Sequence, residues 1–108
     1  LLNEQQIADL IDLLGVEKLR ERVEKLGHQG ADDLPALMAA DGLPDLQAQA
    51  HAMAGMCGML GADRLHGLLK EIETACKTGK DDEARGLSKA LPETWDATLA
   101  AMKAQVGL

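Results

Sequence analysis

One histidine, His51, lies in a helical stretch (Ala50–Leu65) that otherwise consists largely of small and apolar residues. A neutral imidazole is a nucleophile near pH 7, so an exposed histidine can accept a reactive group and pass it on. Residues three, four and seven apart share a helix face, and on the face of His51 these are Gln47, Ala54, Gly55 and Gly58. A glycine inside a helix costs about 1 kcal/mol relative to alanine. The two glycines therefore predict a bare surface on which another molecule docks beside one reactive group.

Metal binding is the alternative chemistry for this region. The possible ligands are His51, Cys57, His66 and Cys76, but no two of them have the i, i+4 or CxxC spacing that zinc sites favour. We therefore expect no metal site. His28 and His66 have no organised neighbourhood and are interpreted as surface residues. The two cysteines are interpreted as buried free thiols, which fits a reducing, cytoplasmic setting.

Length and charge narrow the class of protein further. The 108 residues are enough for one domain, 1–108, and no apolar run approaches the roughly 20 residues that cross a bilayer. A net charge of −7 argues against binding to nucleic acid or to anionic membranes, which requires clustered Lys and Arg. With Trp95 as the only aromatic residue, the core must consist of Leu, Ile, Val, Met and Ala, which suits close helix packing. We expect a monomer.

The spacing of apolar residues predicts an all-α chain, because no stretch alternates with the period of a strand. Five helices are predicted, at Asn3–Leu14, Val16–Leu37, Pro44–Leu60, Ala62–Thr78 and Asp81–Val106. Gly27, Gly30 and Pro35 predict a kink or interruption in the second helix, and Pro92 an interruption or bend in the last. Short connections between long amphipathic helices predict an up-and-down antiparallel four-helix bundle with a short additional N-terminal helix.

The central third of the chain resembles a histidine phosphotransfer (HPt) domain. The pattern is A-H-x-hydrophobic-x-G, small residues, L-G-A and then L-x-x-L-x-x-x-x-E, matched by Ala50, His51, Met53, Gly55, Cys57, Gly58, Leu60, Gly61, Ala62, Leu65, Leu68 and Glu73. The resemblance implies that His51 is the phosphorylated residue, exposed midway along one helix of a four-helix bundle. It also implies that the phosphoryl group arrives from an aspartate on one receiver domain and leaves to an aspartate on another.

The resemblance also implies the cofactors and partners. The partners are receiver domains of response regulators or hybrid kinases, and these supply Mg²⁺, so this chain holds no cofactor and has no autokinase activity. Because the chain starts without methionine, we expect it to be the C-terminal module of a hybrid sensor histidine kinase.

One position departs from the family pattern. Family members usually have a lysine three residues after the histidine, where this chain has Ala54. Gln47 on the same helix is then the nearest polar side chain, and Arg64 or Lys70 on the next helix are candidates to assist the phosphoryl group. The alternative function is a degenerate helical module that binds receivers without being phosphorylated. The dimerisation helices of a histidine kinase are excluded, because their proline-containing H-box is absent.

Overall fold

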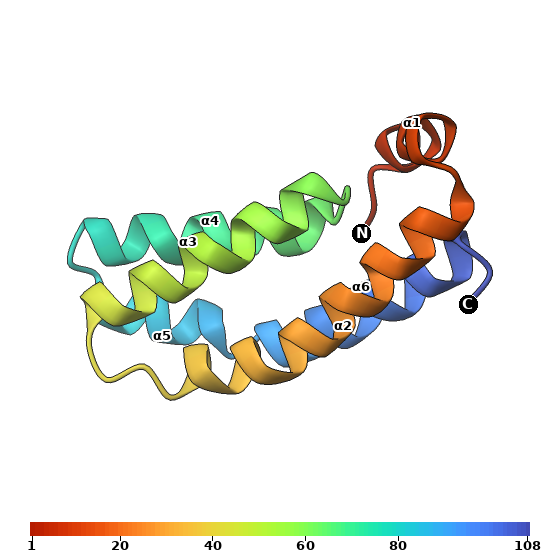
Figure 1. Ribbon diagram of the computed structural model, residues 1–108. Coiled ribbons are helices and arrows are strands. Elements are labelled where there is room, and N and C mark those ends of the chain that lie inside the picture. Colours follow the sequence, from red (N-terminus) through yellow and green to blue (C-terminus); the bar gives the residue numbers. More distant parts are fainter.

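Six helices and the short turns between them make up the computed structural model, which describes residues 1–108 (Figure 1). They are α1 (Glu4–Leu14), α2 (Val16–Met38), α3 (Leu43–Met59), α4 (Asp63–Lys77), α5 (Asp81–Ser88) and α6 (Leu91–Gln105). The predicted all-α class is confirmed. None of the six helices has the length and apolar character that a membrane span requires.

The helix boundaries follow from local signals in the sequence. The side chain of Asn3 accepts a hydrogen bond from the Gln6 backbone N–H at 2.9 Å and so caps the start of α1. Gly15 ends α1 with a φ of 87°, a conformation that glycine adopts without steric cost. Gly61 turns the chain between α3 and α4 with a φ of 77°. This tight turn makes α3 and α4 antiparallel neighbours and fixes their register.

The prolines act differently from one another. Pro35 does not interrupt α2, which is continuous over 23 residues; it lies in the last turn of the helix, where few backbone bonds depend on it. Pro92 lies in the first turn of α6, where a missing N–H has no cost. Pro92 was expected to interrupt or bend the last helix, and the structure shows an interruption. The segment predicted as one helix forms two, α5 and α6. The structure therefore has six helices where five were predicted.

The buried side chains form one core that the long helices surround. Figure 1 shows α2, α3, α4 and the α5–α6 pair running in alternating directions along the molecule. Trp95 of α6 is buried and packs directly on Gly30 of α2, where a Cβ atom would lie 1.9 Å from the indole ring. Gly30 thus belongs to the core because it has no side chain, which explains a glycine in the apolar stripe of α2.

The short helix α1 lies across one end of the molecule, next to the turn between α3 and α4 (Figure 1). Two backbone hydrogen bonds hold the start of the chain there, from the Asn3 N–H to the Gly61 carbonyl at 2.8 Å and from the Arg64 N–H to the Leu1 carbonyl at 3.1 Å. The Gln6 side chain donates a third, through Nε2 to the carbonyl of Gly58 at 2.8 Å. These bonds fix α1 against the C-terminal end of α3.

Candidate functional site

His51 stands on the exposed side of α3, and 68% of its side chain is accessible to solvent. One turn further along, Gly55 is also exposed, and a Cβ atom there would meet nothing within 4 Å. The surface beside the imidazole is therefore open, as the sequence predicted for this position. A large partner can approach the ring without displacing any side chain at position 55.

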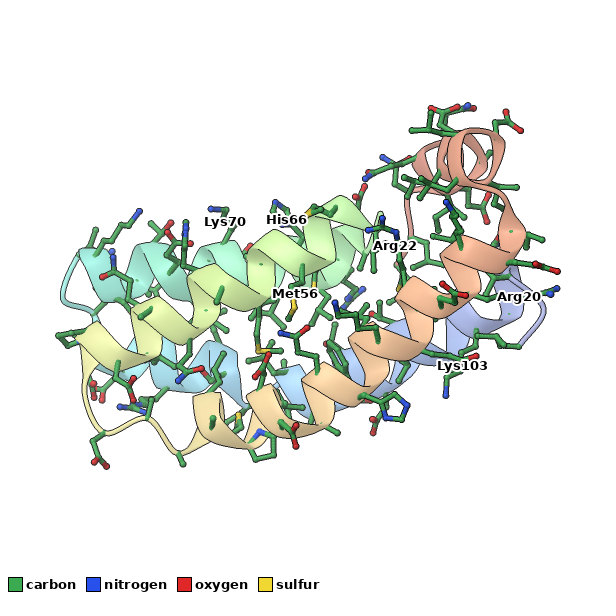
Figure 2. All side chains as sticks on the ribbon, viewed as in Figure 1. Arg20, Arg22, Met56, His66, Lys70 and Lys103 are labelled. Carbon is green, nitrogen blue, oxygen red and sulfur yellow. The ribbon has the colours of Figure 1, made fainter.

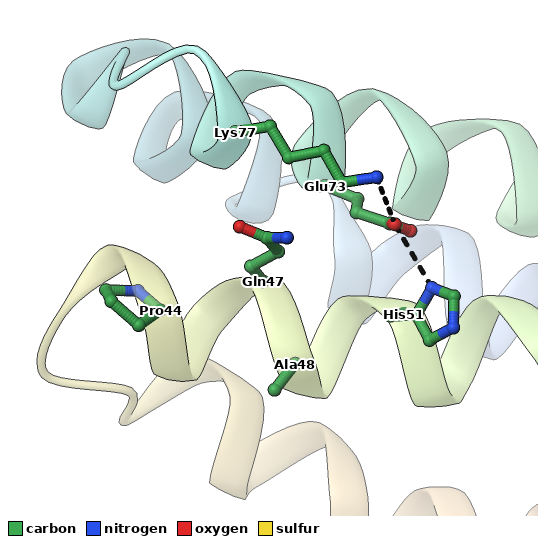
Figure 3. A pocket seen from close by; sticks show the side chains of 6 residues that line it. All are labelled: Pro44, Gln47, Ala48, His51, Glu73 and Lys77. Atoms are coloured by element: carbon green, nitrogen blue, oxygen red, sulfur yellow. Dashed lines mark hydrogen bonds and ion pairs between the residues drawn. The ribbon is translucent and has the colours of Figure 1, made fainter.

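The imidazole is paired with a buried carboxylate from the neighbouring helix. Oε1 of Glu73, on α4, lies 3.1 Å from Nδ1 of His51 (Figure 3). Only 5% of the Glu73 side chain is exposed, and the residue lies between Leu69 and Cys76 on the inward-facing stripe of α4. The register of α3 against α4 brings the two side chains together. Glu73 matched the family pattern by position, but this contact was not predicted from the sequence.

Two lysines on α4 complete the charges around Glu73. Nζ of Lys77 lies 3.0 Å from Oε1, and Nζ of Lys70 lies 3.3 Å from Oε2. The pKa of Glu73 falls from the ordinary 4.5 to about 2, chiefly through the hydrogen bond with Lys77. Burial of the carboxyl group opposes this shift, whereas hydrogen bonds with His51 and Lys70 add to it. Glu73 is consequently a carboxylate throughout the physiological pH range.

The ionised state of Glu73 determines how the His51 ring is protonated. A carboxylate only accepts hydrogen bonds, so Nδ1 must donate to it. In the neutral ring, Nε2 then carries the lone pair. One carboxylate and two lysines give the cluster a local charge of +1, although the chain as a whole has a net charge of −7. The site therefore places a nucleophilic nitrogen atom in positively charged surroundings, which favour the binding of an anionic group.

The hollow beside His51 also contains the predicted assisting residue Gln47. It has a volume of about 460 Å³ and is lined by Pro44, Gln47, Ala48, His51, Glu73 and Lys77 (Figure 3). Lys70 was a candidate from the sequence and contacts Glu73, but Lys77 was missed. Lys77 could have been found from its spacing of four residues from Glu73, which places both side chains on one face of a helix. The contact of Glu73 with the site could have been suspected because Glu73 is an acidic residue within the apolar stripe of its helix.

Three predicted site residues lie elsewhere than expected. Ala54 is fully buried and cannot contact a docked partner. Gly58 is closely packed, since a Cβ atom there would lie 2.9 Å from the His66 ring. Arg64 is nine residues before Glu73 in α4, roughly 13 Å away along the helix axis, and does not line the hollow. Of the predicted docking residues, Gly55 is exposed, Gly58 is half-buried and Ala54 is fully buried.

His66 and the cysteines have structural surroundings. Nδ1 of His66 donates to the backbone carbonyl of Ala54 at 2.8 Å, so His66 links α4 to α3 and is not the plain surface residue that was expected. Both cysteines are buried and free, as predicted. Burial raises the pKa of the Cys57 thiol to about 12, which leaves it unreactive. No three His, Cys, Asp or Glu side chains are grouped so as to hold a metal ion.

Comparison with known proteins gives one match that spans nearly the whole chain. The family model described as Hpt domain matches residues 4–105. Neither the curated proteins nor the solved structures provide a significant match. The matched range includes all six helices and the His51–Glu73 pair. The chain therefore belongs to the Hpt domain family.

Proposed function

We propose that this chain is a phosphorelay intermediate that accepts a phosphoryl group on Nε2 of His51 from a receiver-domain aspartate and passes it to a response regulator. Family membership places the chain in phosphotransfer within two-component signalling. The observation that supports the finer proposal is the contact between Nδ1 of His51 and the buried Glu73 carboxylate. It leaves Nε2 unprotonated on an exposed ring, ready to act as a nucleophile.

In the proposed step, the Nε2 lone pair attacks the phosphorus atom of the receiver's aspartyl phosphate. The N–P bond forms while the bond between phosphorus and the carboxylate oxygen breaks, and its electron pair returns to the receiver's aspartate. The ring keeps its proton on Nδ1 and gains positive charge, which the Glu73 carboxylate stabilises through the 3.1 Å contact. Transfer onward is the same step in reverse, with an aspartate of the second receiver as nucleophile.

Lys70 and Lys77 are proposed to supply the positive charge that family members usually place three residues after the histidine. Nζ of Lys77 and Nδ1 of His51 both contact Oε1 of Glu73, at 3.0 and 3.1 Å, so they are no more than about 6 Å apart. Both lysine side chains are partly exposed, which leaves them free to reorient toward a phosphoryl oxygen. Gln47, in the same hollow, is proposed as a hydrogen-bond donor to that group.

The proposal also includes the setting of the domain. The scaffold is an up-and-down four-helix bundle formed by α2, α3, α4 and the α5–α6 pair, with α1 added. Receivers of response regulators or hybrid kinases are the partners, and they carry the Mg²⁺ ion. We propose that the chain acts in the cytoplasm, in a phosphorelay that includes a hybrid sensor histidine kinase.

The test is phosphotransfer from a panel of isolated, phosphorylated receiver domains. The unchanged chain should gain acid-labile, base-stable phosphate, and His51→Gln should lose it while its helical circular dichroism stays the same. His28→Gln, which alters an exposed histidine on α2, is the matched control and should be labelled normally. Label that persists in His51→Gln refutes the assignment. Binding of receivers by an unchanged chain that is never labelled would instead favour the degenerate binding module.

A further inference from the structure

A second histidine, His66, joins the two helices that carry the reactive pair. Its Nδ1 on α4 donates to the backbone carbonyl of Ala54 on α3 at 2.8 Å. Figure 2 shows His66 on the outer side of α4 together with Lys70, which follows it by one turn and contacts Glu73. His66 is half-buried and does not line the hollow beside His51, so the proposed transfer does not use it directly.

Gly58 makes room for the bond between His66 and Ala54. A Cβ atom at position 58 would lie 2.9 Å from Nδ1 of His66 and 3.0 Å from its Cε1, closer than side chains pack. A side chain there would push the imidazole away from the Ala54 carbonyl. A glycine inside a helix costs about 1 kcal/mol relative to alanine, and at position 58 this cost allows the ring to reach α3.

The bond lies between the turn at Gly61 and the His51–Glu73 pair. Ala54 and His51 precede Gly61 by seven and ten residues, and His66 and Glu73 follow it by five and twelve. The bond is therefore closer to the reactive pair than the turn is, on both helices. No other side-chain hydrogen bond or ion pair joins α3 to α4, apart from the pair itself.

The register of the two helices near the site depends on this bond. Apolar packing is not directional, and Ala54 and Gly58 offer α4 only a methyl group and a bare backbone. A hydrogen bond, in contrast, weakens once its donor and acceptor are more than about 3.2 Å apart. The bond from His66 therefore resists a small sliding of α4 along α3 that apolar contacts alone would permit.

We propose that His66 is a positioning residue for phosphotransfer, whose bond to Ala54 holds α4 in the register that keeps Glu73 against Nδ1 of His51. The inference rests on the proposed function, because it concerns the protonation of the same imidazole. The ion pairs of Glu73 with Lys70 and Lys77 lie within α4 and do not depend on this register. Loss of the bond from His66 therefore moves an ionised carboxylate away from His51, and the ring proton is no longer held on Nδ1.

Two substitutions remove the bond in different ways. His66→Leu removes the donor, whereas Gly58→Ala keeps the imidazole and displaces it. His66→Asn is the rescue variant, because its side-chain amide nitrogen can donate in the place of Nδ1. Gly67→Ala, at an exposed glycine of α4 whose Cβ would meet nothing within 4 Å, is the control for an added methyl group.

The first measurement is ¹⁵N NMR of the neutral His51 ring at pH 8, and the second is transfer from the fastest phosphorylated receiver of the panel. In the unchanged chain, His66→Asn and Gly67→Ala, the ring proton should be on Nδ1 and the transfer rates should agree within about twofold. In His66→Leu and Gly58→Ala, both tautomers should appear and transfer should be roughly tenfold slower, because a small misplacement of a reacting group is costly. The variant with both substitutions should be no slower than the slower single variant, since both remove one bond.

A role in general stability alone would not give this pattern. Circular dichroism and the thermal midpoint establish that each variant is folded at the assay temperature, and Glu73 should stay ionised at pH 5 in all of them, because Lys77 is the chief cause of its low pKa.

A His51 ring that keeps its proton on Nδ1 in both His66→Leu and Gly58→Ala overturns the proposal, and so does unchanged transfer in both. Equally slow transfer in His66→Asn and His66→Leu also overturns it, because the bond to Ala54 would then not be the cause. The tautomer is measured without phosphate. Failure of every receiver to label the unchanged chain would therefore refute the function of His51, while the tautomer in the variants still decides whether His66 sets its contact with Glu73.

Discussion

Replacing Glu73 by glutamine should remove most of the pH dependence of stability between pH 4.5 and 2. The pKa of Glu73 is about 2 in the folded chain and 4.5 ordinarily, so the folded state favours the carboxylate. This stabilisation is complete above pH 4.5 and is lost as the pH falls toward 2. With about 1.4 kcal/mol for each pH unit, the difference corresponds to about 3 kcal/mol. For a domain of this size, this is roughly 10–20 °C in the thermal midpoint.

The measurement is urea unfolding between pH 7 and 2.5, followed by the fluorescence of Trp95, the only aromatic residue of the chain. The unchanged chain should lose about 3 kcal/mol over the acid range, and Glu73→Gln should lose much less over the same range. Glu71→Gln, which alters an exposed carboxylate without an ion pair on the same helix, should follow the unchanged chain. If unchanged chain and Glu73→Gln decline in parallel, the ion pairs with Glu73 do not stabilise the fold and the reasoning is wrong.

The remaining predictions concern the face around His51. Gly55→Ala should raise the free energy of unfolding by up to about 1 kcal/mol, because its Cβ meets open space, whereas Gly58→Ala should lower it because its Cβ meets the His66 ring. Equal thermal midpoints for the two variants would contradict this contrast. Ala54→Lys should lower the free energy of unfolding by about 1–3 kcal/mol, since position 54 is buried beneath α4, without lengthening the lifetime of the phosphohistidine. A stable variant with a longer lifetime would show that the lysine reaches the phosphoryl group.

The sequence predicts correctly the features that depend on residues close to one another along the chain. The N-cap at Asn3 and the turn glycines Gly15 and Gly61 act locally: Asn3 begins α1, and the two glycines follow the ends of α1 and α3, as predicted. The sequence predicts that Pro92 interrupts or bends the last helix. It does not tell which of the two occurs, because that depends on how α5 packs against α4. The exposed position of His51 was indicated by the small residues around it.

The contacts of the site depend on which flank of α3 is covered by α4. Residues three and four after His51 lie about 60° to one side and about 40° to the other. α4 packs on the first side, which buries Ala54 and leaves Gly55 open. The same packing brings Glu73 to the imidazole. The spacing of residues within α3 does not show which flank α4 covers, because that depends on the register between the two helices.

The way α1 is attached has a consequence for how such a domain diversifies. Two of its three anchoring hydrogen bonds join backbone atoms, at Asn3–Gly61 and Leu1–Arg64, and so require no particular side chains on the outer face of the helix. The pair His51–Glu73 belongs entirely to α3 and α4. Substitutions on the exposed face of α1, such as those at Leu13, can therefore accumulate without altering the reactive pair. The exposed face of α1 can therefore change in sequence while the reactive pair on α3 and α4 keeps its geometry.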